Sequence, residues 1–161
     1  MTERKSDASV PIYRNRKYES IVEKLCTRKT SHSSKPIFQY NKDLMVFAAM
    51  VGYTFQAKED LEKDPIQIVL STYATDEKDG FVYLLALLEE QDALSLKDER
   101  ILASVKYFER YCNGGLSIIK KWLDENPGDI DGVDTLADKI FQRIIHNNRE
   151  PGQTGLPIAE F

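Results

Sequence analysis

The stretch Asn41-Lys42-Asp43-Leu44-Met45-Val46-Phe47-Ala48-Ala49-Met50-Val51-Gly52-Tyr53 decides the fold. Asn41 is typical of a helix N-cap, and Asp43 in the first turn suits the positive end of the helix dipole. Gly52 is expected to take the left-handed conformation that ends many helices. Almost every side chain in between is apolar, and a helix that is apolar on all sides is buried on most of them. We therefore expect the central helix of the core here.

Apolar side chains at helical spacing predict five further helices around this one. The predicted ranges are 17–29, 77–90, 98–112, 116–125 and 131–146, with Arg28 and Lys29 in the last turn of the first. The apolar stripes that predict them include Leu84 and Leu88, Leu102 on an inner face, and Ile140 and Ile144. Gly114 and Gly115 are expected to stop the helix over 98–112, because glycine adopts left-handed dihedral angles without penalty. Residues 66–70 are short and β-branched, which fits either a strand or a buried turn of helix. The pattern predicts a mainly α, single-domain bundle of about six helices, with room for one short β element.

Composition and length restrict the class of protein. The chain has 161 residues, of which 42% are hydrophobic and 30% charged, so one domain can bury its own core. It contains no apolar run long enough for a membrane helix, and its polar start does not resemble a signal peptide. Cys26 and Cys112 are far apart, which argues against a zinc site or a disulfide scaffold. We expect a cytoplasmic protein without membrane contact, with a flexible basic N-terminal arm at 1–16, a helical domain at 17–146 and a C-terminal tail at 147–161.

Charge is distributed unevenly along the chain. Residues 1–36 carry nine Lys or Arg and four Asp or Glu, whereas the remainder carries thirteen and twenty-two. Such a basic segment can neutralise phosphates, and neighbouring tyrosines can stack on unpaired bases. Two readings stay open, a nucleic-acid contact or a solvated leader beside core tyrosines. The candidate nucleic-acid-binding residues are Arg14, Arg16, Lys17, Arg28 and Lys29.

No catalytic constellation is recognisable. The chain has two histidines, His32 and His146, and neither stands in a pattern that pairs it with a nucleophile. The aspartates at 129, 131 and 134 lack the spacing of a calcium-binding loop, so helix capping is the expected role. We expect no catalytic residue, no metal and no cofactor. The apolar segment 155–161 either packs on its own domain or docks on another subunit, which leaves a homo-oligomer open.

Three blocks of the sequence resemble a known family. They are residues 18–25, residues 36–53 with their loop and central helix, and residues 79–87. They are similar to the small accessory proteins of bacterial DNA phosphorothioation (Dnd) systems called Dnd system-associated protein 4. The resemblance implies a bacterial defence setting in which sulfur replaces a backbone oxygen of host DNA and unmodified DNA is restricted. The resemblance supplies this setting and no mechanism. Combined with the residues themselves, it leads us to expect a non-catalytic accessory protein whose partners belong to that modification and restriction system, with weak DNA contact through the basic arm.

Two alternatives to this function remain. The first is a pure protein-interaction module without nucleic-acid contact, which fits the acidic body of the chain. The second is a metal-dependent nuclease subunit, which would require Asp and Glu side chains from several helices to converge around a cation.

Overall fold

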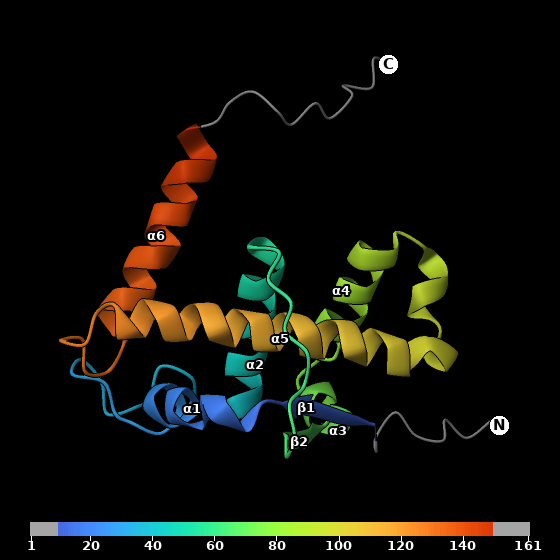
Figure 1. The fold of residues 1–161 in the computed structure, drawn as a ribbon, viewed down its shortest axis with the longest axis horizontal. Helices are drawn as coiled ribbons and strands as arrows, with labels where there is room; N and C mark the ends of the chain where they lie inside the picture. The colour runs from blue at the N-terminus through green and yellow to red at the C-terminus, as the bar shows by residue number, and fades with distance from the viewer. Residues whose placement is uncertain (1–9, 150–161) are drawn as a thin grey trace.

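A computed structural model of the chain describes residues 10–149 (Figure 1). Residues 1–9 of the expected arm and 150–161 of the expected tail lie outside the described residues. The elements in chain order are β1 (Pro11–Arg14), η2 (Arg16–Tyr18), α1 (Glu19–Cys26), α2 (Asn41–Thr54), β2 (Ile66–Val69), α3 (Leu70–Ala74), α4 (Gly80–Glu90), η3 (Ala93–Leu96), η4 (Asp98–Arg100), α5 (Ile101–Asp124) and α6 (Val133–Arg149).

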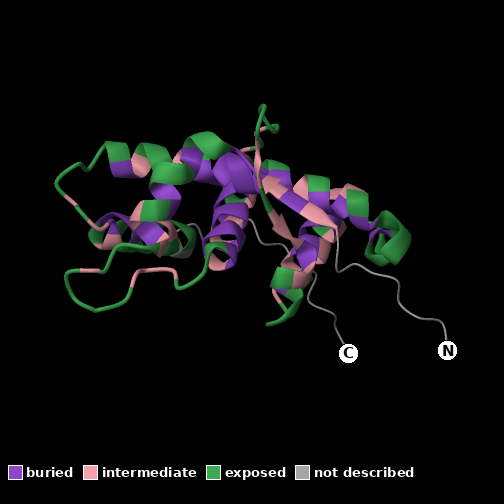
Figure 2. Ribbon diagram, turned by 90° about the horizontal axis from the view of Figure 1, so that it is seen from below, coloured by how far each residue is buried: buried purple, intermediate pink, exposed green. Residues whose placement is uncertain are grey.

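The expected mainly α single domain with a small β element is confirmed. Helix α5 crosses the whole molecule, and α2 crosses α5 near its middle (Figure 1). Residues from both helices, among them Leu44, Ala48, Phe108 and Leu116, are completely buried. Figure 2 shows the buried residues concentrated around this crossing. The stretch that we expected to form the central helix therefore does so.

The expected helix break at Gly114 and Gly115 is wrong. Helix α5 runs without interruption from Ile101 to Asp124, so the two helices predicted on either side are one. A Cβ atom added to Gly115 would lie 1.7 Å from the carbonyl oxygen of Ala48, and one added to Gly114 would lie 2.1 Å from that of Ala57. The glycines therefore let other backbone segments approach α5 closely, which overrides their poor helix propensity.

The expected ends of the central helix also need correction. Helix α2 begins at Asn41 itself, its N-cap is Tyr40, and no side chain caps it. Gly52 lies inside the helix, where an added Cβ would come within 2.0 Å of the carbonyl oxygen of Tyr111. The left-handed conformation falls instead on Gln56, with a φ of 52°. Gly52 thus serves the crossing with α5, as Gly114 and Gly115 do.

The N-terminal segment is built into the domain from residue 11. Strand β1 pairs with β2 in antiparallel register, with Pro11 opposite Val69 and Arg14 opposite Ile66. The ambiguous segment 66–70 is therefore a strand, and Leu70 at its end begins the short helix α3. The N–H of Tyr13 donates to Glu109 Oε1 at 2.8 Å, which fixes β1 to α5.

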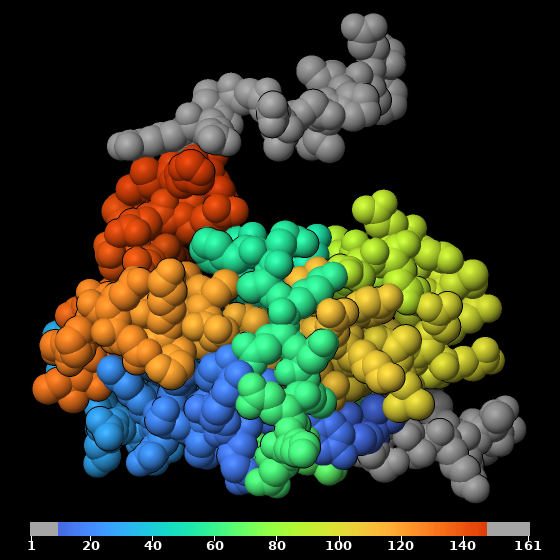
Figure 3. Space-filling model, in the orientation of Figure 1, coloured from blue at the N-terminus to red at the C-terminus, as the bar shows by residue number. Residues whose placement is uncertain are grey.

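Helix α6 joins the domain mainly through its first turn. Thr135 and Leu136 are buried, but Ile140 and Ile144 are 45% and 53% exposed. Their helical spacing predicts that they share one apolar face with Leu136; they do face the body, but the body leaves them about half exposed. The helix rises away from the body, so its later turns lie above it (Figures 1 and 3). None of the helices described between residues 10 and 149 is long and apolar enough to cross a membrane.

Candidate functional site

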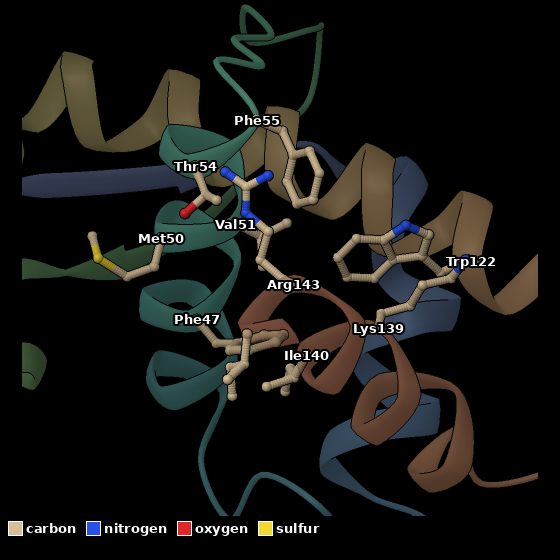
Figure 4. Close-up of a pocket in the computed structure, with 10 residues that line it drawn as sticks. Phe47, Met50, Val51, Thr54, Phe55, Trp122, Lys139, Ile140 and Arg143 are labelled. Atoms are coloured by element: carbon tan, nitrogen blue, oxygen red, sulfur yellow. The ribbon is translucent and has the colours of Figure 1, made fainter. Parts of the chain in front are cut away.

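An apolar cleft lies between α6 and the body of the domain (Figure 4). It has a volume of about 200 Å³, and its lining comes from α2, α5 and α6. Phe47, Met50 and Val51 contribute from α2, Trp122 from α5, and Ile140 and Ile144 from α6. The cleft exists because α6 carries an apolar face that the body covers only at its first turn.

Aromatic contacts shape one wall of this cleft. The Phe55 and Trp122 rings meet edge to face, with centroids 5.8 Å apart. The Arg143 guanidinium lies 5.4 Å from the centroid of the Phe55 ring, within range of a cation–π contact. The Nε atom of Arg143 is buried and has no hydrogen-bond partner among the described residues. Lys139 is the second cation that lines the cleft.

The loop before α6 is organised by the acidic residues that we expected to cap a helix. Asp129 Oδ2 accepts a hydrogen bond from the Thr135 N–H at 2.7 Å, and its Oδ1 accepts one from Gly132 at 3.1 Å. Asp131 accepts from Val133 at 3.1 Å and from Ser31 at 2.7 Å, and these two N–H donors lower its pKa to about 2. Among residues 10–149, no three His, Cys, Asp or Glu side chains form a group able to hold a metal ion.

The candidate nucleic-acid-binding residues are distributed over three environments. Arg14 is only 2% exposed and pairs with Glu19 at 2.7 Å, so it does not face a ligand in this conformation. Arg16 and Lys17 are exposed and pair with Asp64 and Glu59, each at 2.8 Å.

Arg28 and Lys29 are exposed just after α1, which ends at Cys26, and not in its last turn as expected. The pairs Arg16–Lys17 and Arg28–Lys29 thus lie near opposite ends of α1. The eight residues of α1 correspond to roughly 12 Å at a helical rise of 1.5 Å. This is about three to four base-pair steps of 3.4 Å along a duplex.

A buried polar cluster explains why the basic segment is folded. The Asn15 side chain is fully buried, donates to Glu59 Oε1 at 2.9 Å, and accepts from the Glu62 N–H at 2.7 Å. The hydroxyl of Tyr18 donates to Glu59 Oε2 at 2.6 Å, and burial raises its pKa to about 12. Tyr18 is therefore a core tyrosine, and Glu59 receives three donors from the basic segment, one of them Lys17.

A second group of exposed apolar side chains lies on neighbouring elements at the far end of α5 from α6. Five exposed leucines come from neighbouring elements, and we call them the leucine surface. Their exposed fractions range from 39% to 62%; Leu84 and Leu88 are on α4, Leu94 and Leu96 on η3, and Leu102 on α5. We expected Leu84, Leu88 and Leu102 on inner helix faces, and that expectation is wrong. The apolar run over residues 81–88 is a signal of this surface, since one helix cannot bury all its sides against one neighbour.

The fold defines a small helical protein, and the part between residues 10 and 149 exposes apolar side chains and cations. The family model for DNA sulphur modification system-associated protein 4 matches residues 12–152. The chain therefore belongs to that family, and its association with a DNA sulphur modification system follows. Comparisons with curated proteins and with solved structures give no match.

Proposed function

We propose that this chain is a non-catalytic accessory protein of a bacterial DNA phosphorothioate modification and restriction system. It acts in the cytoplasm by binding a protein of that system, with additional DNA contact through exposed cations. The observation that supports the protein contact is the leucine surface. Isolated exposed leucines are ordinary, but five on adjoining elements are typical of an interaction site.

The charges around the leucine surface indicate the chemistry of the partner. In the segment 91–100, exposed carboxylates outnumber exposed cations, with Asp92, Asp98 and Glu99 against Lys97 and Arg100. Arg100 is already paired with Glu90 at 2.7 Å. Interfaces place apolar side chains at their centre and complementary charges at the rim. The partner surface therefore has an apolar centre and a basic rim.

Co-expression with the other proteins of the system tests this contact. The double variant Leu84→Asp and Leu88→Asp places two charges on one face of α4 and should abolish co-purification of the partner. Leu61→Asp is the matched control, because Leu61 is also exposed but lies in the loop between α2 and β2. Retention of the partner by the double variant, or its loss from both variants, contradicts the proposed surface.

DNA contact is proposed for Arg16, Lys17, Arg28 and Lys29. Each neutralised phosphate contributes about −0.9 to the slope of log K against log salt concentration. Contact through all four cations gives a slope of about −3.6, and contact through two of them gives about −1.8. Deletion of residues 1–17 would remove β1 as well, so charge reversal is the cleaner perturbation.

The variant Arg28→Glu with Lys29→Glu should halve the salt slope for a short duplex. Lys97→Glu, an exposed cation at the other end of the molecule, is the control. If the native chain binds no DNA at low salt, the alternative of a pure protein-interaction module is favoured. In that case the co-purification experiment still tests the proposed protein contact.

A further inference from the structure

The cleft between α2 and α6 combines an apolar wall with two cationic side chains, and these features indicate which kind of ligand fits it. Its α6 wall is apolar and about half exposed, so an occupant that buries Ile140 and Ile144 gains free energy from the area removed from water. Both charged residues of the lining, Lys139 and Arg143, are cations. In the described part of the chain, neither forms an ion pair with a carboxylate, and the buried Nε of Arg143 has no acceptor.

An occupant of this cleft must therefore bring apolar side chains together with a carboxylate. A buried donor that gains an acceptor recovers the free energy that its desolvation costs. A charge-assisted bond from a guanidinium to a carboxylate is among the stronger hydrogen bonds in proteins. Such a ligand would cover the exposed isoleucines and give Arg143 its missing acceptor at once.

Residues 156–161 of this chain carry that chemistry. The segment contains three large apolar residues, Leu156, Ile158 and Phe161, and one carboxylate, Glu160. It follows α6, the helix that forms the exposed wall, after Pro151 and Gly152, which suit a reversal of chain direction.

The connection is long enough for the segment to return to the cleft. The α6 residues that line it, Lys139 to Ile144, precede Arg149 by five to ten residues. At a rise of 1.5 Å per residue the segment must travel back roughly 8–15 Å. The residues from 150 to 160 span up to roughly 36 Å when extended, at about 3.3 Å each.

We propose that residues 156–161 bind in the cleft of their own chain, with Glu160 accepting from Arg143 and the apolar side chains covering Ile140 and Ile144. A short tether gives an effective concentration in the millimolar range. A free peptide with a dissociation constant of about 0.1 mM would therefore be about 90% bound when tethered. This inference does not depend on the proposed function, because it concerns a different surface.

The single tryptophan of the chain, Trp122, lines the cleft and reports on its occupancy. In the full chain, the double variant Leu156→Asp and Ile158→Asp should raise the fraction of open clefts roughly tenfold, seen as greater acrylamide quenching of Trp122. A synthetic peptide of residues 150–161, added to this variant, should restore protection with a dissociation constant near 0.1 mM. Circular dichroism confirms that the variant is folded.

A charge exchange in the full chain tests the specific pairing. Arg143→Glu and Glu160→Arg should each open the cleft, and their combination should restore protection. Lys97→Glu should leave Trp122 unchanged. Unaltered quenching in the apolar double variant, or failure of the charge exchange to restore protection, overturns the proposal. Protection that falls on dilution also overturns it, because the segment would then bind a second copy.

Discussion

The crossing of α2 and α5 yields the sharpest test of how this fold is held together. In the variant Gly115→Ala, the new Cβ would lie 1.7 Å from the Ala48 carbonyl oxygen and 2.9 Å from the Gly52 nitrogen. Ordinary contact begins at 3.4 Å, so this gap must open by about 1.7 Å. Backbone atoms of a helix cannot rotate away, and the two helices must therefore separate.

The energetic cost can be worked out from this geometry. Overpacking a core costs 1–3 kcal/mol and occasionally more, and a collision with rigid backbone belongs at the upper end, at about 4 kcal/mol. Alanine regains about 1 kcal/mol of helix propensity over glycine. The net loss is about 3 kcal/mol in the free energy of unfolding. For a chain of this size that lowers Tm by about 9 °C.

Urea and thermal unfolding, followed by circular dichroism, measure this loss. Gly80→Ala is the matched control, because Gly80 also lies in a helix and an added Cβ meets nothing within 4 Å. It should be neutral or stabilising by up to about 1 kcal/mol. Gly52→Ala also forces α2 and α5 apart at this crossing. The double variant with Gly115→Ala should therefore lose less free energy of unfolding than the two single variants lose together. A Gly115→Ala protein as stable as the native chain would refute the reasoning.

Three further predictions concern single groups. Burial raises the pKa of Glu109 from 4.5 to about 7. The free energy of unfolding should therefore fall by up to about 3 kcal/mol as pH rises through this range. In Glu109→Gln, urea unfolding should no longer show that fall. Asp129→Ala removes two acceptors from the start of α6, which should cost about 1–2 kcal/mol and speed amide exchange in that helix. Burial raises the pKa of Cys112 to about 12 and that of Cys26 to about 11, so a disulfide reagent at pH 8 should label both only after unfolding.

The sequence pattern predicts the central helix well because its signal is local. A helix over residues 44–51 satisfies its backbone hydrogen bonds within the segment itself, and its apolar side chains are removed from water by burial on most sides. The continuity of α5 is a different case, because propensity alone penalises a helix through Gly114 and Gly115 by about 1 kcal/mol each. The compensating contact comes from Ala48 and Ala57, more than 50 residues earlier. Only the tertiary structure contains that information.

For the candidate surfaces too, the sequence predicts which side chains share a helix face but not which of these faces the fold covers. Helical spacing identifies Ile140 and Ile144 as one stripe, but spacing does not say which stripes the rest of the chain covers. The body buries the apolar face of α6 only at its first turn, so this stripe lines an open cleft. Leu84 and Leu88 of α4 are exposed for the same reason, since the neighbouring elements cover only part of that helix.

In the folded protein, cations of the basic first part of the chain form ion pairs with carboxylates of the acidic remainder. Arg16 and Lys17 belong to the basic first part, yet they pair with Asp64 and Glu59 from the acidic remainder. The two parts are thus complementary within one domain. Exposed pairs of this kind contribute at most about 1 kcal/mol, so a phosphate can replace the carboxylate at little cost. Among residues 10–149, Arg28 and Lys29 form no ion pair with a carboxylate, so we expect the proposed DNA contact to be centred at the end of α1.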